Sequence, residues 1–322
     1  MQRSNVNAVD NPSHIAWRGP GMKLGLFVPH TGPLASAGFL KEIAMEAEEL
    51  GFTGLWVVDA PARPPGDRVA NFYEPLTVLG WLAGVTSRVA LGTGVLVLPY
   101  RNPVLLARSL AAVDQLSQGR LLLGVGVGHV ESENRILGAP PYEERGRVSN
   151  EWLRLINTFW TDEQPKFSGR YVQFESDELY PGPRPFQKPR PPILVGGASG
   201  SAVRRALRLG DGYFPVLRSI ETMEQQIAML KTEAERLGRS LDGFPLLALG
   251  WTNILEQAVG SDGEREVLTG TPDQVGADLS RLHELGLKHV GLSFREASSE
   301  DDYRRQMRTA AKETMPALSR LA

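Results

Sequence analysis

Residues 88–128, RVALGTGVLVLPYRNPVLLARSLAAVDQLSQGRLLLGVGVG, decide the fold class of this chain. The stretch holds two apolar runs, 88–99 and 120–128, which have the length and composition of buried strands. Between them, residues 104–119 repeat apolar side chains at helical spacing and end at Gly119, a typical helix C-cap. Strands that are apolar on both faces occur in parallel sheets covered by helices. This stretch therefore predicts a strand–helix–strand unit of an α/β fold.

The same alternation of strands and helices runs through most of the chain. We expect further strands at 23–28, 55–59, 191–197, 211–216, 245–255 and 288–294, and further helices at 38–50, 75–86, 201–209, 223–238, 272–286 and 300–321. About eight strands and eight helices close a (β/α)8 TIM barrel. We therefore predict an α/β protein with a single TIM-barrel domain over residues 22–322.

Two segments depart from this pattern. Residues 1–21 mix Asn, Ser, Pro and Gly without a hydrophobic period, so we expect a flexible N-terminal extension. Residues 161–190 are rich in Pro and Gly and interrupt the alternation. We expect them to form an insertion between strands four and five, partly β and partly lid.

The composition excludes several classes of protein. The 322 residues carry a formal charge of −2, so no basic excess predicts binding to nucleic acid or to an anionic membrane. No apolar run approaches the roughly 20 residues needed to span a bilayer, and the start lacks the apolar core of a secretory signal. The absence of cysteine excludes disulfides, thiolate metal sites and cysteine nucleophiles. We expect a cytoplasmic protein.

Polar residues follow several predicted strands, and in TIM barrels the functional groups lie at these carboxyl ends. His30 follows the first strand, Asp59 ends the second, and His129 and Glu133 follow the fourth. His129, Glu133 and His30 are the candidates for general acid–base catalysis, because imidazole and carboxyl groups can transfer protons there. A histidine that is only solvated or packed remains the alternative. No two of the five histidines have the spacing of metal ligands, so we predict no metal site.

Residues 196–201 form the strongest candidate for an anion site. They are all small: Gly196, Gly197, Ala198, Ser199, Gly200 and Ser201. The segment follows a predicted strand and opens a helix, whose free N–H groups and dipole favour a phosphate. The alternative is an ordinary strand-to-helix turn with a serine N-cap.

A second glycine cluster, GVGVG at residues 124–128, ends the fourth strand. It does not fit the dinucleotide fingerprint G-x-G-x-x-G, because His129 stands where the third glycine is required. A nicotinamide-dependent dehydrogenase of the doubly wound type is therefore disfavoured. Gly126 and Gly128 instead leave a slot in which a flat ring system can lie.

Several of these stretches together resemble a known family. Residues 91–128 resemble the signature of the luciferase-like monooxygenase class, and ILVGGASGSAVRRALRLGDGYF (193–214) is similar to the phosphate-loop strand and helix of that class. The resemblance runs from about Met22 to the C-terminus. Within the class, LPYRNP (98–103) and GTPDQVGADLSRLHELGLKHVGL (270–292) are most similar to the branch that uses the deazaflavin coenzyme F-420 rather than FMN.

The resemblance implies a TIM barrel and a set of cofactor contacts. Gly94 and Val95 match the family's non-proline cis peptide, which forms a bulge that supports the central ring of the cofactor. Asp59 matches the acidic residue that hydrogen-bonds the ring. Residues 196–201 match the phosphate loop.

Two departures from the family pattern bear on the activity. Ala60 stands where the deazaflavin dehydrogenases often carry histidine, and His129 stands in place of an aromatic or glutamate residue. Because alanine cannot transfer a proton, sugar-phosphate dehydrogenase activity is disfavoured. His129 then either takes over acid–base work or shapes the pocket.

The leading hypothesis is an F-420-dependent oxidoreductase that transfers a hydride between the deazaflavin and an unidentified small organic substrate. One alternative is a luciferase-like monooxygenase that uses O2 and reduced FMN, supplied by a partner reductase. Another is a non-catalytic flavin-binding barrel. Members of the family are commonly dimers, so we also expect a homodimer.

Overall fold

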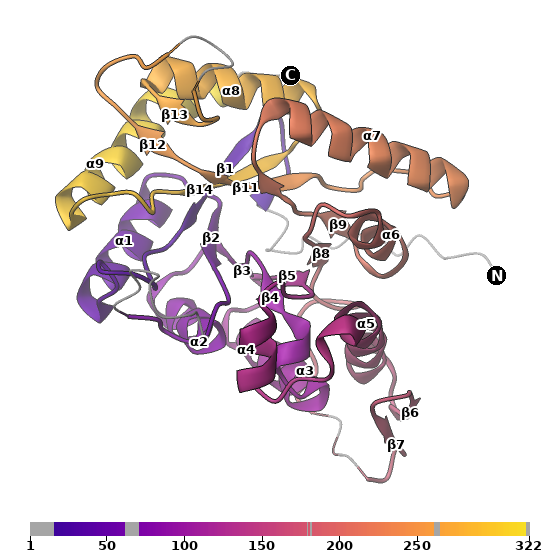
Figure 1. Ribbon diagram of the computed structural model, residues 1–322. Coiled ribbons are helices and arrows are strands. Elements are labelled where there is room, and N and C mark those ends of the chain that lie inside the picture. The colour runs from indigo at the N-terminus through magenta and orange to yellow at the C-terminus, as the bar shows by residue number, and fades with distance from the viewer. Residues whose placement is uncertain (1–15, 62–70, 179, 181, 261–264, 320–322) are drawn as a thin grey trace.

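The computed structural model describes residues 16–61, 71–178, 180, 182–260 and 265–319. The chain forms a barrel of parallel strands surrounded by helices (Figure 1). The wall consists of β1 (Lys23–Phe27), β2 (Gly54–Val57), β3 (Ala90–Thr93) with its continuation β4 (Leu96–Val97), β5 (Leu121–Gly126), β8 (Ile193–Val195), β9 (Gly212–Tyr213) with its continuation β10 (Val216–Leu217), β11 (Leu247–Trp251) and β14 (His289–Ser293).

The hydrogen-bonded order of these strands closes on itself. β1 pairs with β2 and β14, and the path continues through β3, β5 and β8 on one side and through β11 on the other, all in parallel. β9 pairs with β8 and β10 pairs with β11, and both belong to the single segment 212–217. This broken strand joins the two ends of the sheet. The predicted TIM barrel is confirmed.

A long helix follows each wall strand and packs on the outside of the barrel. These helices are α1 (Ala37–Glu49), α2 (Pro75–Val85), α3 (Pro103–Leu116), α5 (Arg145–Thr161), α6 (Gly200–Leu209), α7 (Ile220–Arg236), α8 (Pro272–Glu284) and α9 (Glu300–Thr309). Shorter elements are η2 (Leu98–Tyr100), α4 (Glu131–Ile136), η3 (Tyr142–Glu144), the pair β12 (Asn253–Ile254) and β13 (Thr269–Gly270), the π-helical turn η4 (Ala310–Thr314) and α10 (Met315–Leu318). The strands are apolar on both faces because one face meets the helices and the other meets the barrel axis.

Helix α5 is the longest element that the sequence analysis did not assign. Its buried residues include Val148, Trp152, Leu155 and Phe159, which recur at helical spacing. The signal was therefore present in the sequence, although polar residues such as Arg154 interrupt it. α5 supplies the helix that the barrel requires after its fourth strand.

The segment predicted as an insertion lies between α5 and β8. It contains a short antiparallel hairpin, β6 (Phe167–Ser168) and β7 (Gln173–Phe174). The Glu151 carboxylate on α5 accepts hydrogen bonds from three successive N–H groups of the hairpin turn, at 2.9, 2.9 and 3.1 Å. Arg108 of α3 donates to the Gly182 carbonyl at 2.7 Å. These contacts run along the outer helices α3 and α5, whereas the sequence analysis expected part of this segment to act as a lid.

The Trp56 indole occupies the barrel axis. It is fully buried, and its ring lies 4.7 Å from the Phe214 ring between centroids. The neighbouring strands carry glycine where they face it: a Cβ added to Gly92 would lie 2.3 Å from the indole, and one added to Gly25 would lie 2.5 Å from it. Glycine at these positions is therefore a steric requirement of the core.

A buried hydrogen-bonded chain ties residues before the first strand to the barrel. Trp56 donates its Nε1–H to His289 Nε2 at 2.9 Å, and His289 Nδ1 lies 2.7 Å from the Ala16 carbonyl oxygen. His289 and Ala16 are both fully buried. The carbonyl of Ala16 satisfies a buried donor that would otherwise have no partner. Ala16 is thus part of the barrel core, in contrast to the flexible extension expected over residues 1–21; residues 1–15 lie outside the described residues.

We predict that His289 makes stability depend on pH. Burial lowers the pKa of His289 to about 4, so the folded state keeps the ring neutral while the unfolded chain binds a proton below about pH 6.5. Stability is therefore lost as pH falls below that value, by about 2 kcal/mol between pH 6.5 and 5. Urea denaturation of the wild type and of His289→Gln measures this, because glutamine can keep both hydrogen bonds but does not titrate. If the free energy of unfolding changed equally with pH in the two proteins, the prediction would be contradicted. Both proteins contain His30, so its contribution cancels in the comparison.

Candidate active site

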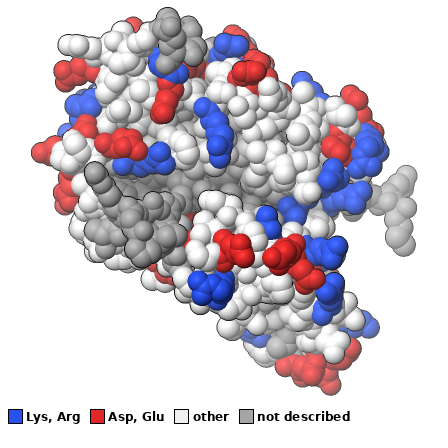
Figure 2. Space-filling view, in the orientation of Figure 1, with Lys and Arg blue, Asp and Glu red and all other residues white. Residues whose placement is uncertain are grey.

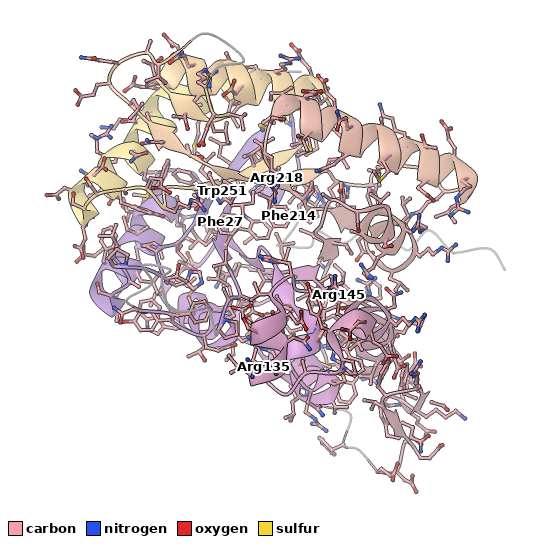
Figure 3. The ribbon with its side chains drawn as sticks, viewed as in Figure 1. Phe27, Arg135, Arg145, Phe214, Arg218 and Trp251 are labelled. Atoms are coloured by element: carbon pink, nitrogen blue, oxygen red, sulfur yellow. The ribbon has the colours of Figure 1, made fainter. Side chains whose placement is uncertain are left out.

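A cavity of about 660 Å³ lies at the carboxyl ends of β1, β2, β11 and β14. Its described lining comes mainly from the segments that follow β1, β2 and β14, together with Trp251 at the end of β11. In Figure 3 the labelled Phe27, Phe214, Trp251 and Arg218 come from wall strands or the loops after them, and Arg145 lies across from them on α5. Figure 2 shows that the surface is hollowed between these two sides. TIM-barrel active sites lie at this end of the fold.

His30 lines the cavity, but both of its ring nitrogens are bonded to main-chain groups. Nδ1 lies 3.0 Å from the Val28 carbonyl oxygen, and Nε2 lies 3.0 Å from the carbonyl oxygen and 3.2 Å from the nitrogen of Val58. A neutral ring with its proton on Nδ1 satisfies the Val28 carbonyl and the Val58 N–H together. Burial lowers the pKa of His30, which favours this neutral form. His30 therefore bridges the ends of β1 and β2.

Asp59 is buried, and both of its carboxylate oxygens are bonded. Oδ2 accepts from the Val97 N–H at 2.9 Å and from Arg101 at 2.5 Å, and Oδ1 accepts from Arg101 at 3.1 Å. Arg101 also pairs with Glu74 at 2.8 Å. Burial alone would lower the pKa of Arg101, but the hydrogen bonds and charges of Asp59 and Glu74 raise it. In this arrangement Asp59 braces β2 against the segment after β4, rather than offering a free carboxylate to a ring.

His129 and Glu133 lie on the rim formed by the start of α4, and their surroundings differ. His129 is exposed, and its carbonyl accepts from the Tyr142 hydroxyl at 3.0 Å. Glu133 is buried, and its Oε2 accepts from the Tyr100 hydroxyl at 2.9 Å. Its Oε1 is buried without a hydrogen-bond partner in the described structure. Burial, followed by the hydrogen bond to Glu133, raises the pKa of Tyr100.

A surface of small residues lies at the ends of β4, β5 and β8. The peptide bond between Gly94 and Val95 is cis, and Gly94, Val95, Gly126 and Gly128 are all half-exposed. A Cβ added to Gly126 would lie 2.7 Å from the Val95 side chain, and one added to Gly196 would lie 2.8 Å from it. The glycines therefore let the main chain close around Val95. The result is a partly exposed surface on which valine is the largest side chain of these four residues.

The amino end of α6 adjoins this surface through Gly196. Ser199 is the N-cap, and its hydroxyl oxygen accepts from the Ala202 N–H at 3.2 Å. Gly197 has a φ of +105°, and its carbonyl accepts from the Tyr213 hydroxyl at 2.8 Å, which holds the turn. The N–H groups of Gly200 and Ser201 begin the helix and have no carbonyl within it to bond. The serine N-cap and an anion site are thus compatible here.

The structure brings the predicted site residues together in separate groups around one mouth. The cis peptide, the strand-end glycines and residues 196–201 share the side formed by β4, β5 and β8. His30 and Asp59 lie on the side formed by β1 and β2, and His129 and Glu133 lie on α4 or the loop before it. All three groups lie at the carboxyl ends of the wall strands, the end of the fold where TIM-barrel active sites lie.

Comparison with known proteins agrees with this geometry. Residues 22–256 match the family model described as luciferase-like monooxygenase. The chain belongs to the luciferase-like monooxygenase family. The resemblance predicted from the sequence is therefore confirmed, and the protein is an oxidoreductase of this class.

Relatives of this luciferase-like protein differ in the cofactor that their names record. An uncharacterised protein of Mycobacterium tuberculosis is 31% identical over 221 residues, which cover 67% of this chain and 76% of that protein. The FMNH(2)-dependent dimethylsulfone monooxygenase of Pseudomonas putida is 28% identical over 237 residues, 72% of this chain and 64% of that enzyme. The F420-dependent glucose-6-phosphate dehydrogenase of Kineococcus radiotolerans is 34% identical over 178 residues, 55% of this chain and 51% of that enzyme.

Solved structures support the fold. An F420-dependent secondary alcohol dehydrogenase, solved with an F420–acetone adduct, superposes with a TM-score of 0.79 at 18% identity, and the match covers 92% of this chain and 99% of that one. The family therefore contains F420-dependent and FMN-dependent members on one barrel.

Two further findings concern metals and membranes. Within the described part of the chain, no group of three or more His, Asp or Glu side chains is arranged to hold a metal ion. Among the described helices, none combines the length and apolar character needed to cross a membrane.

Two residues at the mouth were not singled out from the sequence. Arg101 is the cation that Asp59 requires, and it lies within the quoted motif LPYRNP. Tyr100, its neighbour in that motif, is the partner of Glu133. The sequence alone does not show that Arg101 pairs with Asp59 or that Tyr100 bonds to Glu133, because these contacts join residues far apart in the chain.

We predict that Arg101→Gln lowers the free energy of unfolding by about 3–5 kcal/mol, because it leaves the Asp59 carboxylate buried without its cation. The double variant Asp59→Asn, Arg101→Gln should recover much of that loss, since no charge remains buried. Urea denaturation at pH 7 measures both. Arg281→Gln is the control: it removes an exposed ion pair with Glu224 and should cost less than about 1 kcal/mol. If Arg101→Gln lowered the free energy of unfolding no more than this control, the ion pair of Asp59 and Arg101 would not be needed for stability.

Proposed function

We propose that this protein is an F-420-dependent oxidoreductase that transfers a hydride between the deazaflavin and an unidentified small organic molecule. The observation that carries the proposal is the half-exposed surface of Val95 and strand-end glycines beside the amino end of α6. A planar ring can lie on this surface because its residues carry no side chain larger than valine. A phosphate attached to the ring can then reach the N–H groups that begin α6.

Each group of residues has a distinct part in this proposal. Val95, Gly126 and Gly128 would support the ring, and residues 196–201 would bind the phosphate through main-chain N–H groups and the hydroxyls of Ser199 and Ser201. When bound, F-420 supplies a carbon centre that donates or accepts a hydride. The guanidinium of Arg204 donates to the Ser201 hydroxyl oxygen at 3.4 Å and also pairs with Glu233 at 3.1 Å, so it would orient this hydroxyl.

Proton transfer is assigned to the rim rather than to the cavity wall. His30 has both ring nitrogens bonded to main chain, so its role is to hold the ends of β1 and β2. His129 is exposed at the mouth and can exchange protons with solvent and with a bound molecule. Glu133, bonded to Tyr100, is the alternative proton carrier on α4.

The second candidate function is an FMN-dependent monooxygenase that uses O2 and reduced flavin from a partner reductase. The same surface and helix end also fit FMN, and the relative from Pseudomonas putida carries an FMNH(2)-dependent name. F-420 is favoured by the motifs at 98–103 and 270–292 and by the relative from Kineococcus radiotolerans. A non-catalytic flavin-binding barrel remains the third candidate, because Ala60 removes one proton-transferring position.

The assembly and location are also part of the proposal. Leu105 and Leu116 of α3 are 65% and 68% exposed beside a groove between α2 and α3. Apolar surface of this kind is typical of a subunit interface, which supports a homodimer. Sedimentation equilibrium that finds only monomer would contradict this. The cysteine-free composition supports a cytoplasmic location.

Cofactor titration tests the proposed function. We expect F-420 to bind with a Kd in the micromolar range or lower, about −8 kcal/mol, and FMN to bind less tightly. Fluorescence titration of the purified protein with each compound measures this. Tighter binding of FMN, together with oxygen uptake by the reduced complex, would move the assignment to the monooxygenase.

The substitution Ser199→Asp tests where the phosphate lies. Aspartate is a good N-cap, so α6 should persist, but its charge would repel the phosphate and weaken cofactor binding at least about 100-fold. Ser36→Asp is the matched control, because Ser36 caps α1 in the same way without belonging to the proposed phosphate loop. Unchanged affinity in a folded Ser199→Asp protein would place the phosphate elsewhere.

The substitution of His129 tests the proton-transfer role. We expect His129→Ala to keep cofactor affinity within a few-fold and to lose turnover by about 10²–10⁴, the usual range for general acid–base catalysis. Steady-state kinetics with a substrate found by screening measures kcat and KM. His129→Gln keeps a similar shape and hydrogen-bonding capacity but cannot ionise. Full turnover in that variant would leave His129 with a pocket-shaping role only.

A further inference from the structure

The cavity at the mouth is distinct from the surface proposed for the cofactor. It lies over the ends of β1, β2, β11 and β14, whereas the surface around Val95 and the α6 loop lie over β4, β5 and β8. None of residues 196–201 lines it. Its volume of about 660 Å³ falls within the range typical of small-molecule sites, about 300–1,000 Å³. A second molecule can therefore bind beside the cofactor surface.

Polar and apolar groups share the accessible lining of the cavity about equally. Val58 and Phe72 are half-buried and contribute apolar surface, whereas Phe27 and Phe294 are almost fully buried. Trp251 stands at the end of β11 with 38% of its surface exposed. Aromatic rings prefer offset-stacked or edge-to-face contacts with other rings. Trp251 and Phe72 therefore favour a ligand that contains a ring.

The buried polar side chains of the lining already have partners within the protein. His30 is bonded to the main chain at Val28 and Val58. The Tyr303 hydroxyl donates to the Phe27 carbonyl at 2.6 Å. The hydrogen bonds of His30 and Tyr303 are therefore used within the protein, so these two side chains are poorly placed to bind a strongly polar ligand.

The charges of the described lining cancel. Its formal charges are Arg295 and Glu296, which form an ion pair at 3.1 Å. The Arg295 guanidinium also lies over the Trp251 ring, 3.9 Å from its centroid. Glu296 lies beside this cation, so the described lining offers an anionic ligand no net positive charge.

Two uncharged hydroxyl groups remain available. Thr31 and Ser293 line the cavity and are half-buried, and in the described structure neither hydroxyl makes a hydrogen bond. A hydroxyl can both donate and accept, so either can bind a carbonyl or alcohol oxygen. Ala60 adds only a methyl group at the end of β2.

We propose that this cavity binds an uncharged ring compound with a carbonyl or hydroxyl group, held by Trp251 and the neighbouring aromatic rings. This assignment deepens the proposed function, on which it rests for the statement that the bound compound is the substrate. It excludes sugar phosphates and other strongly anionic compounds from this cavity.

Isothermal titration calorimetry with two matched probes tests the proposal. 2-Naphthol is uncharged at pH 7, and 2-naphthyl phosphate carries the same ring with a phosphate of about −1.5 to −2 charge. We expect 2-naphthol to bind at least 10-fold more tightly than 2-naphthyl phosphate, with or without F-420 or FMN present. Equal or tighter binding of the phosphate would overturn the proposal, as would failure of 2-naphthol to bind under every one of these conditions.

Three variants locate the binding. Trp251→Ala should weaken 2-naphthol binding at least 10-fold, whereas Trp81→Ala, which removes an equally exposed tryptophan from α2, should leave it unchanged. Glu296→Gln should reduce the ratio of the two affinities, 2-naphthol over 2-naphthyl phosphate, because it removes the carboxylate that pairs with Arg295. Equal effects of the two tryptophan substitutions would overturn the assignment to this cavity. Selective naphthol binding supports the assignment whether or not F-420 or FMN binds, so cofactor titration tests the proposed function separately.

Discussion

The packing of one tryptophan inside a ring of parallel strands constrains this structure more than any other interaction. The Trp56 indole fills the barrel axis, so the strands that face it carry glycine. A methyl group at Gly92 would overlap the ring, and larger groups would open the wall. The indole N–H is satisfied by His289, and His289 in turn by the Ala16 carbonyl. One large side chain thereby links the centre of the barrel to the chain before β1.

At the carboxyl ends of the strands, most of the buried polar groups described above hold strands and loops together. His30 joins the ends of β1 and β2, and the pair of Asp59 and Arg101 joins β2 to the segment after β4. Such groups fix the positions of loops, because breaking one leaves a buried partner unsatisfied. What remains for ligands is a surface of glycine and valine, the first N–H groups of α6 and the rim around His129. The buried polar groups at the mouth therefore fix the loops, and the exposed groups can contact a ligand.

This division explains why the family's chemistry is difficult to assign to one cofactor. A flat ring and a phosphate are common to FMN and F-420, and the contacts proposed here are made by main chain, glycine and serine, which do not distinguish the two ring systems. Selectivity must come from the loops that follow the strands, which differ most among barrel enzymes. The described cavity, with its balanced charges and free hydroxyls, is one such feature of this chain.

The alternation of apolar runs and helical periods in the sequence was sufficient to predict the barrel, its strands and most of its helices, because hydrophobic period is a local property that burial on both faces imposes. It also located the glycines and the serine-capped helix end, since these depend on position relative to a strand. The tertiary structure alone decided that Asp59 pairs with Arg101, that His30 bonds to Val28 and Val58, and that Ala16 enters the core. Each of these depends on which segments the closed sheet brings side by side. Propensity and spacing carry no information about a partner 42 or 273 residues away, so only the folded chain could show which polar residues hold the loops and which remain free for chemistry.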